Sequence, residues 1–280
     1  MEIKADTVKK LRDATGAGMM DCKKALIKAD GDFAAAEKIL KEMGLAAVAK
    51  RSDRATDNGR VFIRVENGKA VMLELSCETD FVARNEDFVK LGEDMTKTII
   101  EKGYTEPNDE LKGMVAELIS VIKENMQLKR FVVIDVPADT YVASYIHGEG
   151  SLGVMVELKS DKPEAFKNET VTEFAHDCAL HVAAFTPMFL SASTVDPAYT
   201  AEQTEIFRAQ VAGMDKPEKV LEGIVKGKVN KLYSEVCFLQ QPFVKDDKVS
   251  VEQKLNALSK EVGAKLQIVS FQFYRAGAEA

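Results

Sequence analysis

The segment Val61–Cys77 reads VFIRVENGKAVMLELSC and predicts a β-hairpin. Apolar side chains alternate along Val61–Val65, as they do in a strand with one buried face. Asn67-Gly68 is a strong two-residue turn signal, because both residues tolerate the positive φ that such turns need. The chain should then return as a buried second strand over Ala70–Cys77.

Helical and strand patterns after this hairpin complete the first folded unit. Helices are expected over about Glu86–Glu101 and Asn108–Met126, where apolar residues recur at helical spacing. A third strand is expected over Phe131–Val136. We therefore take residues 60–139 as a core N-subdomain.

A second unit, residues 140–280, repeats much of this order. Strands are expected over Tyr141–Ile146 and Leu152–Lys159, followed by a helix that passes through Val171 and Val182. The segments Asn67–Leu75 and Gly150–Leu158 place their apolar residues alike. This repetition indicates two related α+β subdomains, so the predicted fold class is α+β.

Residues 196–233 interrupt the second unit with two predicted helices, each opened by a proline. Apolar residues of the second helix recur at a four-three-four spacing, which favours a projecting antiparallel coiled-coil hairpin over a core element. The chain is then expected to form a strand at Val236–Leu239, a helix opened by the capping box Ser250–Gln253, and a last strand over Leu266–Tyr274.

Residues 1–45 predict three short helices that resemble a ubiquitin-associated bundle. Asp6 is expected to cap the first helix, Gly16–Gly18 to separate it from the second, and Gly44 to end the third. Residues 46–59 are rich in alanine and charged side chains and predict a charged, partly helical linker.

The composition narrows the class of protein. A chain of 280 residues with 46% apolar and 30% charged residues and a net charge of -7 suits a soluble acidic protein. The acidic balance argues against direct binding of nucleic acid, which needs a basic face. No apolar run approaches the ~20 residues of a membrane span, and Met1–Asp6 carries acids where a targeting peptide would not, so we expect a cytoplasmic protein without membrane contact.

No residue pattern indicates an enzyme, a cofactor or a metal. Gly16–Gly18 is too short for a dinucleotide fingerprint, and no phosphate-binding loop motif occurs. His176 and His181 lie ~140° apart around a helix and cannot share one ion. Asp177 and His181 share a face, so we expect an intrahelical pair. The four cysteines stand far apart and are expected to be buried thiols.

The tetrapeptide Thr79-Asp80-Phe81-Val82 follows the buried strand of the hairpin. In one interpretation Thr79 or Asp80 caps a helix and Phe81 tucks back against it. In the other, Phe81 stays exposed in order to enter a partner. His147 poses a similar choice at the tip of the second hairpin, between an exposed turn residue and a partner contact.

Several motifs together resemble one family. They are Thr15–Leu26 (TGAGMMDCKKAL), Cys77–Ala83 (CETDFVA), Ser144–Gly148 (SYIHG), the helical hairpin, and Gln241–Val244 (QPFV). In this order they resemble the family of translation elongation factor Ts, the nucleotide exchange factors of the GTPase elongation factor Tu. The resemblance implies a ubiquitin-associated-like head, two core subdomains and a coiled-coil hairpin.

The resemblance also implies roles for individual residues. Thr79, Asp80, Phe81 and Val82 would enter the GTPase near its magnesium and phosphate sites, with Asp80 and Phe81 driving release of GDP. Met19 and Met20 of the head would grip the same domain, and His147 is a further candidate contact. No cofactor is implied.

Other functions stay open at this point. The head could be the recognition module of a ubiquitin-type adaptor without exchange activity. Cys178 with the nearby histidines could serve a thiol or metal enzyme. A homodimer and a higher-order complex with the GTPase are also open alternatives.

Overall fold

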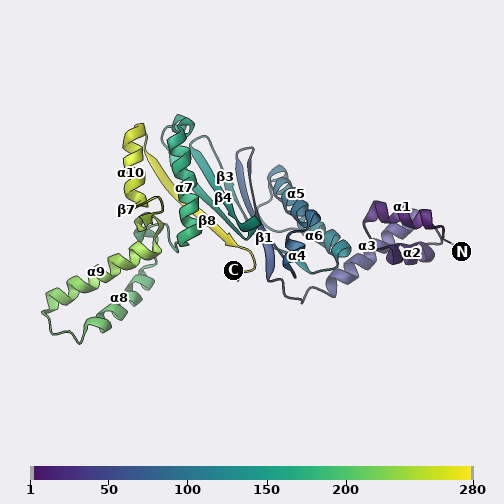
Figure 1. Ribbon diagram of the computed structural model, residues 1–280, viewed down its shortest axis with the longest axis horizontal. Coiled ribbons are helices and arrows are strands. Elements are labelled where there is room, and N and C mark those ends of the chain that lie inside the picture. Colours follow the sequence, from purple (N-terminus) through teal and green to yellow (C-terminus); the bar gives the residue numbers. More distant parts are fainter. Residues whose placement is uncertain (1–2, 279–280) are drawn as a thin grey trace. The chain divides into compact units, whose positions relative to one another are not determined.

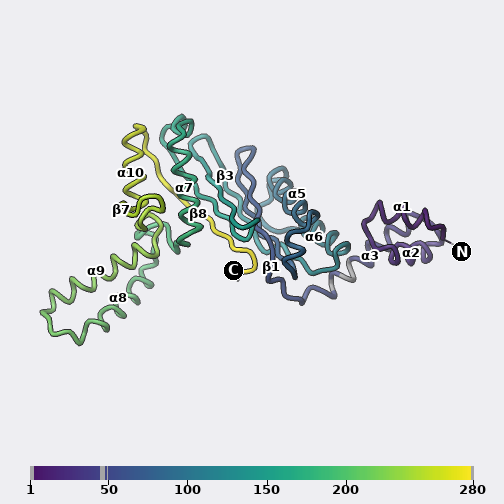
Figure 2. Tube along the Cα trace, viewed as in Figure 1, coloured from purple at the N-terminus to yellow at the C-terminus, as the bar shows by residue number. Residues whose placement is uncertain are grey.

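The computed structural model describes residues 3–278, apart from the side chains of residues 45–47 and 49 (Figures 1 and 2). It is an α+β protein, as predicted, and divides into two compact units. The first comprises Met1–Asp135, Gly148–Leu152 and Tyr274–Ala280, and the second Val136–His147 and Gly153–Phe273. No helix within the described residues has the length and apolar character of a membrane span.

Three helices open the first unit: α1 (Ala5–Thr15), α2 (Met19–Lys28) and α3 (Phe33–Ala49). We call residues 3–49 the head. Its small core consists of Val8, Leu11, Cys22, Ala25, Leu26, Ala36 and Leu40. The predicted cap at Asp6 is wrong, because α1 begins at Ala5 with Lys4 at the cap position, and Asp6 lies inside its first turn.

The predicted end of α3 at Gly44 is also wrong, because the helix runs on to Ala49. A Cβ atom at Gly44 would lie 2.9 Å from the Cβ of Ser120 on α6 (Asp109–Ile122). The glycine therefore permits close packing of two helices and does not stop one. Residues 46–49 of the expected linker belong to α3, in line with the partly helical linker that the composition predicts.

A three-stranded antiparallel sheet follows, with the order β1 (Asn58–Glu66), β2 (Lys69–Cys77), β3 (Met126–Asp135). The predicted hairpin is confirmed: Val65 pairs with Ala70 around the turn, where Asn67 and Gly68 have φ of 52° and 71°. β3 begins five residues before the predicted Phe131, because α6 ends at Ile122 and not at Met126.

Helices α4 (Asp80–Ala83), α5 (Glu86–Lys102) and α6 pack with this sheet (Figure 1). Phe88, Met95 and Ile99 of α5 are fully buried, as their helical spacing predicts. Gly92 of α5 faces the ring of Phe62 on β1, and a Cβ there would lie 2.3 Å from ring carbons.

The second unit contains a sheet of order β4 (Thr140–His147), β5 (Leu152–Ser160), β8 (Leu266–Arg275). Helix α7 (Glu169–Phe185) packs on β4, and α10 (Val251–Val262) begins with the predicted capping box of Ser250 and Gln253. Shorter elements join them: the 3-10 turns η2 (Pro163–Lys167), η3 (Ala192–Thr194) and η4 (Phe238–Gln240), and the two-stranded pair β6 (Pro242–Phe243) and β7 (Asp246–Ser250). The 3-10 turn η1 (Gly148–Gly150), between β4 and β5, belongs to the first unit.

Between η3 and η4 lie α8 (Pro197–Val211) and α9 (Glu218–Val236), which pack side by side (Figure 1). The hydroxyl groups of Thr200 and Tyr233 are 3.2 Å apart across this pair. The predicted strand at Val236–Leu239 is wrong, because α9 continues to Val236 and η4 follows. Phe238 is buried there, with its ring 5.4 Å from that of His181.

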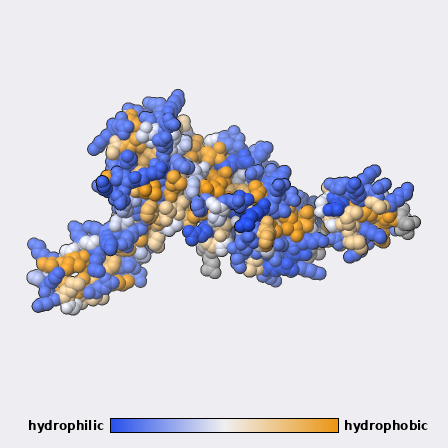
Figure 3. All heavy atoms as spheres, viewed as in Figure 1, coloured by the Kyte–Doolittle hydropathy of each residue, from blue (hydrophilic) through white to orange (hydrophobic). Residues whose placement is uncertain are grey.

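Hydrophilic side chains cover most of the visible surface, and hydrophobic groups show through in separate patches (Figure 3). Among the large apolar side chains that the structure describes, Phe81 has the largest exposed fraction. Phe81 lies just after the end of β2.

Candidate functional site

The short helix α4 presents the predicted tetrapeptide at the end of β2. Thr79 caps it, since its Oγ1 accepts a hydrogen bond from the backbone N–H of Val82 at 3.3 Å. Phe81 does not tuck back, because 80% of it is exposed. The structure thus combines the cap of the first interpretation with the exposed aromatic side chain of the second. Val82 is buried at 7%, so its side chain anchors the turn in the core and offers little surface to a partner.

A carboxylate holds the cap from the other side. The hydroxyl of Thr79 donates to Glu124, whose Oε2 and Oε1 lie 3.0 and 3.1 Å away. The backbone carbonyl of Thr79 accepts from the thiol of Cys77, at an S–O distance of 3.2 Å. A helix of four residues cannot hold itself together, so these outside contacts fix the turn.

Asp80 takes part in a loose chain of charges. Its Oδ2 lies 3.4 Å from a guanidinium nitrogen of Arg84, and Arg84 Nε lies 3.6 Å from Glu149 of η1. All three side chains are more than half exposed, so these ion pairs contribute little to stability. The carboxylate of Asp80 remains accessible beside Phe81.

The residue before the tetrapeptide, Glu78, is more firmly held. Its Oε1 accepts from the backbone N–H of Asn125 at 2.6 Å and from Arg54 at 3.2 Å. The N–H of Asn125, aided by Arg54, holds the pKa of Glu78 below its usual value. The segment is therefore tied to the chain on both sides of Thr79.

The predicted contacts of the head lie at the start of α2. Met19 is 43% exposed and Met20 is 63% exposed. Ile27 and Phe33 add further exposed apolar surface to the head. Four of the predicted site residues, Met19, Met20, Asp80 and Phe81, thus present accessible side chains within the first unit.

His147 ends β4 in the second unit and is exposed. Its Nδ1 lies 2.9 Å from the hydroxyl of Tyr145, which fixes the ring beside the strand end. The structure therefore leaves His147 accessible.

The predicted pair of Asp177 and His181 does not form. His181 is fully buried, its Nε2 lies 2.9 Å from Oε1 of Gln241, and its Nδ1 accepts from the N–H of Val244. Asp177 instead pairs with Lys245 at 3.3 Å. Because Nδ1 is an acceptor, the ring is the neutral tautomer with its proton on Nε2. Burial lowers the pKa of His181, while the bond to Gln241 opposes this effect.

These contacts explain the motif Gln241–Val244 in structural terms. The amide of Gln241 also donates to the carbonyl of Glu235 at 2.7 Å, which orients its oxygen toward His181. The motif thus locks the end of α9 to α7 within the second unit.

The thiols offer no reactive group. All four cysteines are buried, and burial raises the pKa of Cys77 to about 12 and that of Cys178 well above its usual value. No cluster of three or more potential metal ligands was found in the described part of the chain. The alternative of a thiol enzyme is not supported by this burial.

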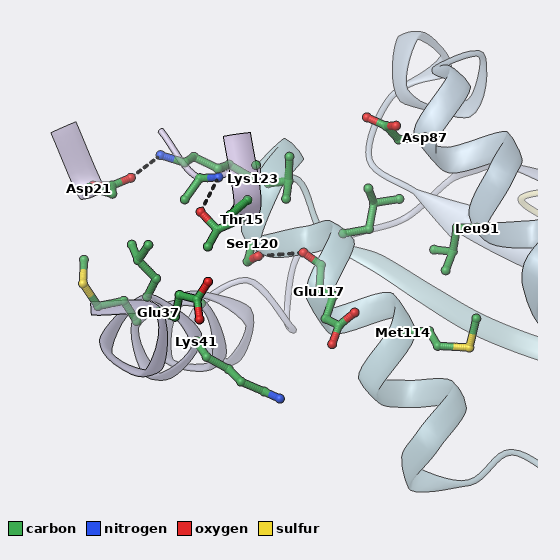
Figure 4. A pocket seen from close by; sticks show the side chains of 18 of the residues that line it. Thr15, Asp21, Glu37, Lys41, Asp87, Leu91, Met114, Glu117, Ser120 and Lys123 are labelled. Carbon is green, nitrogen blue, oxygen red and sulfur yellow. Dashed lines mark hydrogen bonds and ion pairs between the residues drawn. The ribbon is translucent and has the colours of Figure 1, made fainter. Parts of the chain in front are cut away.

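Sequence reasoning missed Glu124 and Asn125, which hold the turn, and Lys123, which pairs with Asp21 of the head. They follow α6, where a longer helix was predicted, and they contact residues more than forty positions away along the chain. A cavity of about 790 Å³ lies nearby, lined by residues of the head and of α5 and α6 (Figure 4). No local sequence signal marks these long-range contacts.

Comparisons with known proteins agree with one another. A profile of the family described as Elongation factor TS matches residues 78–278. The chain is 51% identical over 277 residues to Elongation factor Ts of Treponema denticola, covering 99% of both chains. It is 43% identical to the protein of the same name from Treponema pallidum over the full length of both, and 42% identical to that of Borrelia hermsii over 99% of this chain and all of the relative.

Proposed function

This chain belongs to the elongation factor Ts family and is a guanine nucleotide exchange factor for elongation factor Tu; we propose that the turn Asp80–Phe81 drives the exchange. The observation that carries this proposal is the 80% exposure of Phe81 on a turn whose cap is held by Glu124. An apolar side chain presented on a fixed turn is suited to enter a pocket of a partner. It acts by binding and not by chemistry on a substrate.

Exchange follows from linkage between two ligands of the GTPase. If this protein binds the nucleotide-free GTPase better than the GDP-bound form, the affinity for GDP must fall by the same factor. A coupling of ~3 kcal/mol corresponds to a weakening of roughly 150-fold. The protein needs contacts that exist only when the nucleotide site is open.

Phe81 can supply a large part of such a coupling. Burying a phenylalanine is worth ~1.5–3 kcal/mol, and this gain is realised only in the state whose pocket is open. The turn is formed before binding, so little conformational entropy is lost when the ring is buried. Phe81 would therefore stabilise the open, nucleotide-free form of the GTPase by filling its pocket, and we call this side chain the wedge.

Asp80 adds a charge to the same site. Its carboxylate would approach a partner site that is organised around Mg²⁺ and phosphates. A carboxylate there competes for the cation and repels the phosphates, which disfavours the bound arrangement. Release of Arg84 from Asp80 costs little, because the pair is exposed.

The other predicted contacts extend the interface. Met19 and Met20 project from the head, and methionines adapt well to a partner surface. We assign His147 a separate contact from the second unit. The ubiquitin-associated-like character of the head and the coiled-coil character of α8 and α9 belong to this proposal, with the hairpin as a further contact or a route to self-association.

The adaptor function is not favoured. A head-only recognition module would share its ancestry over residues 1–45, whereas the relatives match nearly the whole chain. Because the proposed partner works in protein synthesis, we place this protein in the cytoplasm.

The test is release of a fluorescent GDP analogue from elongation factor Tu of the same species. A substoichiometric amount of this protein is expected to accelerate release, because each molecule acts on many GTPase molecules. Unchanged release with folded protein would refute the exchange function for this chain.

A further inference from the structure

Three consecutive residues after α6 contact the head, the adjacent residues Glu78 and Thr79, and the segment that connects the head to β1. Lys123 pairs with Asp21 of the head at 2.8 Å. Glu124 accepts from the hydroxyl of Thr79, and Asn125 donates its backbone N–H to Glu78. We call Lys123–Asn125 the tie.

The backbone of the tie is itself unusual. Lys123 has a φ of 69°, in the left-handed region that residues other than glycine rarely adopt. Its N–H still bonds the carbonyl of Ile119, which closes the last turn of α6. This conformation turns the following residues toward Glu78 and Thr79 and leaves the side chain of Lys123 near Asp21 (Figure 4).

The contact of Glu124 determines how the wedge is presented. The Thr79 hydroxyl has one proton, which points to Glu124, so a lone pair is left for the N–H of Val82. Without Glu124 the hydroxyl could rotate, and the cap of α4 would weaken. Phe81 lies in the first turn of that helix, and its direction depends on the cap.

The contact of Lys123 acts on the head. Asp21 lies in the first turn of α2, directly after the exposed Met19 and Met20. A Cβ at Gly18 would lie in ordinary van der Waals contact, 3.4 Å from Asp21 Oδ2 and 3.6 Å from Lys123 Nζ, so the ion pair lies directly beside the backbone of Gly18. The ion pair joins the head to the end of α6 beside the cavity that both line (Figure 4).

Asn125 completes the tie. It is 2% exposed, and its side-chain amide donates to the carbonyl of Arg54 at 2.7 Å. The tie is thus anchored to the segment that connects the head to β1 as well as to Glu78.

We propose that Glu124 and Lys123 are positioning residues for nucleotide exchange, which hold the wedge Phe81 and the head methionines ready to engage one GTPase molecule together. The inference rests on the proposed function. Two contacts on one rigid body bind more tightly than the same contacts on a loose chain, because the second forms at a high effective concentration.

The two contacts should have separable effects. Loss of the Glu124 contact should reduce the maximal rate of stimulated GDP release, since the wedge then samples other directions. Loss of the Lys123 contact should raise the concentration of this protein that gives half-maximal release and leave the maximal rate unchanged, since the head then binds less often.

The Glu124 contact is tested with a pair of variants measured over a range of protein concentrations. Glu124→Ala should lower the maximal release rate about tenfold, as expected for loss of a hydrogen bond to a charged group. Glu124→Gln keeps an acceptor for Thr79 and should stay within about twofold of wild type. A glutamine variant as slow as the alanine variant would overturn the positioning role, because it would show that the charge itself acts.

A double-mutant cycle guards against an effect on folding alone. Thr79→Val removes the same hydrogen bond from the other side, so Thr79→Val and Glu124→Ala combined should be no slower than the slower single variant. If the double variant instead slows release by the product of the two single effects, the two residues act independently and the proposed coupling between Thr79 and Glu124 is overturned. If Glu124→Ala fails to fold, the comparison of Glu124→Gln with Thr79→Val decides the same question.

The Lys123 contact is tested by charge reversal. Lys123→Asp should raise the half-maximal concentration about twofold to fivefold, the range expected for an exposed ion pair, and Asp21→Lys in the same chain should restore it. Failure of the exchanged pair to restore the value would overturn this role. If the wild-type protein does not accelerate GDP release, the proposed function itself is refuted. If the wild-type protein and Phe81→Ala behave as proposed, but the Glu124 and Lys123 variants match wild type, only the present inference is refuted.

Discussion

Phe81→Ala is the most informative substitution, because the side chain makes few contacts in the free protein. A fully buried phenylalanine gains ~1.5–3 kcal/mol over an exposed one, and with 80% of Phe81 exposed about four-fifths of this, ~1.2–2.4 kcal/mol, is available to a partner. At 1.4 kcal/mol per factor of ten, stimulated GDP release should slow by about 7- to 50-fold.

The same exposure predicts that folding is unaffected. The free energy of unfolding should change by less than about 0.5 kcal/mol, as for other surface substitutions. Thr79 and Val82 keep their capping bond in the variant, so the turn itself should persist.

The assay is stopped-flow release of a fluorescent GDP analogue at a fixed concentration of elongation factor Tu, with thermal unfolding measured in parallel. Val65→Ala is the matched control, since Val65 is also exposed and pairs with Ala70 at the opposite end of the hairpin from Cys77. Val65→Ala should stimulate GDP release from elongation factor Tu as strongly as the wild-type protein does. Release by Phe81→Ala within twofold of wild type, from folded protein, would refute the wedge.

Three further predictions concern stability and reactivity. Because burial lowers the pKa of His181 below its ordinary value of 6.5, the unfolded state takes up a proton first, so unfolding free energy should fall as pH drops below that value. Thermal melts between about pH 8 and pH 5 should show this loss of stability in wild type and a smaller loss in His181→Leu. If stability falls equally steeply with pH in both proteins, the assignment of His181 as a buried neutral side chain is contradicted. Gly44→Ala should lower stability by ~1–3 kcal/mol in denaturant titrations, although alanine favours helices, because its Cβ would meet Ser120 at 2.9 Å; a stabilised variant would contradict the close packing. With the pKa of Cys77 raised to about 12 and all four thiols buried, a disulfide reagent near pH 8 should react only after denaturant is added, and rapid labelling of native protein would contradict their burial.

Local signals made much of the fold predictable. Asn67 and Gly68 adopt the positive φ that marks their turn, and Ser250 and Gln253 form the capping box that their spacing indicates. In both places a few adjacent residues determine the backbone by themselves.

Two of the wrong predictions of secondary structure lie where the segment contacts a distant part of the chain. Gly44 lies inside a helix at a point where Ser120 packs against it, and residues 236–239 leave the strand pattern at a point where Phe238 packs beside His181. The apolar pattern of that segment reflects burial, which helices and 3-10 turns share with strands.

The candidate site shows the same division. Sequence placed Asp80 and Phe81 at the end of a strand, but it left the direction of Phe81 open, because exposure depends on the surrounding fold. Glu124 was missed because its bond to Thr79 joins residues 45 positions apart. Its role could be recognised only once both residues were placed in space.

The most direct test of the account compares two affinities of the wild-type protein, one for nucleotide-free and one for GDP-bound elongation factor Tu, by titration calorimetry. The account predicts tighter binding to the nucleotide-free form by roughly 100-fold, within the range of couplings between sites. It also predicts that Phe81→Ala reduces this ratio mainly by weakening binding to the nucleotide-free form. Equal affinities for the two forms would contradict the account, because a ligand without preference cannot shift the nucleotide equilibrium.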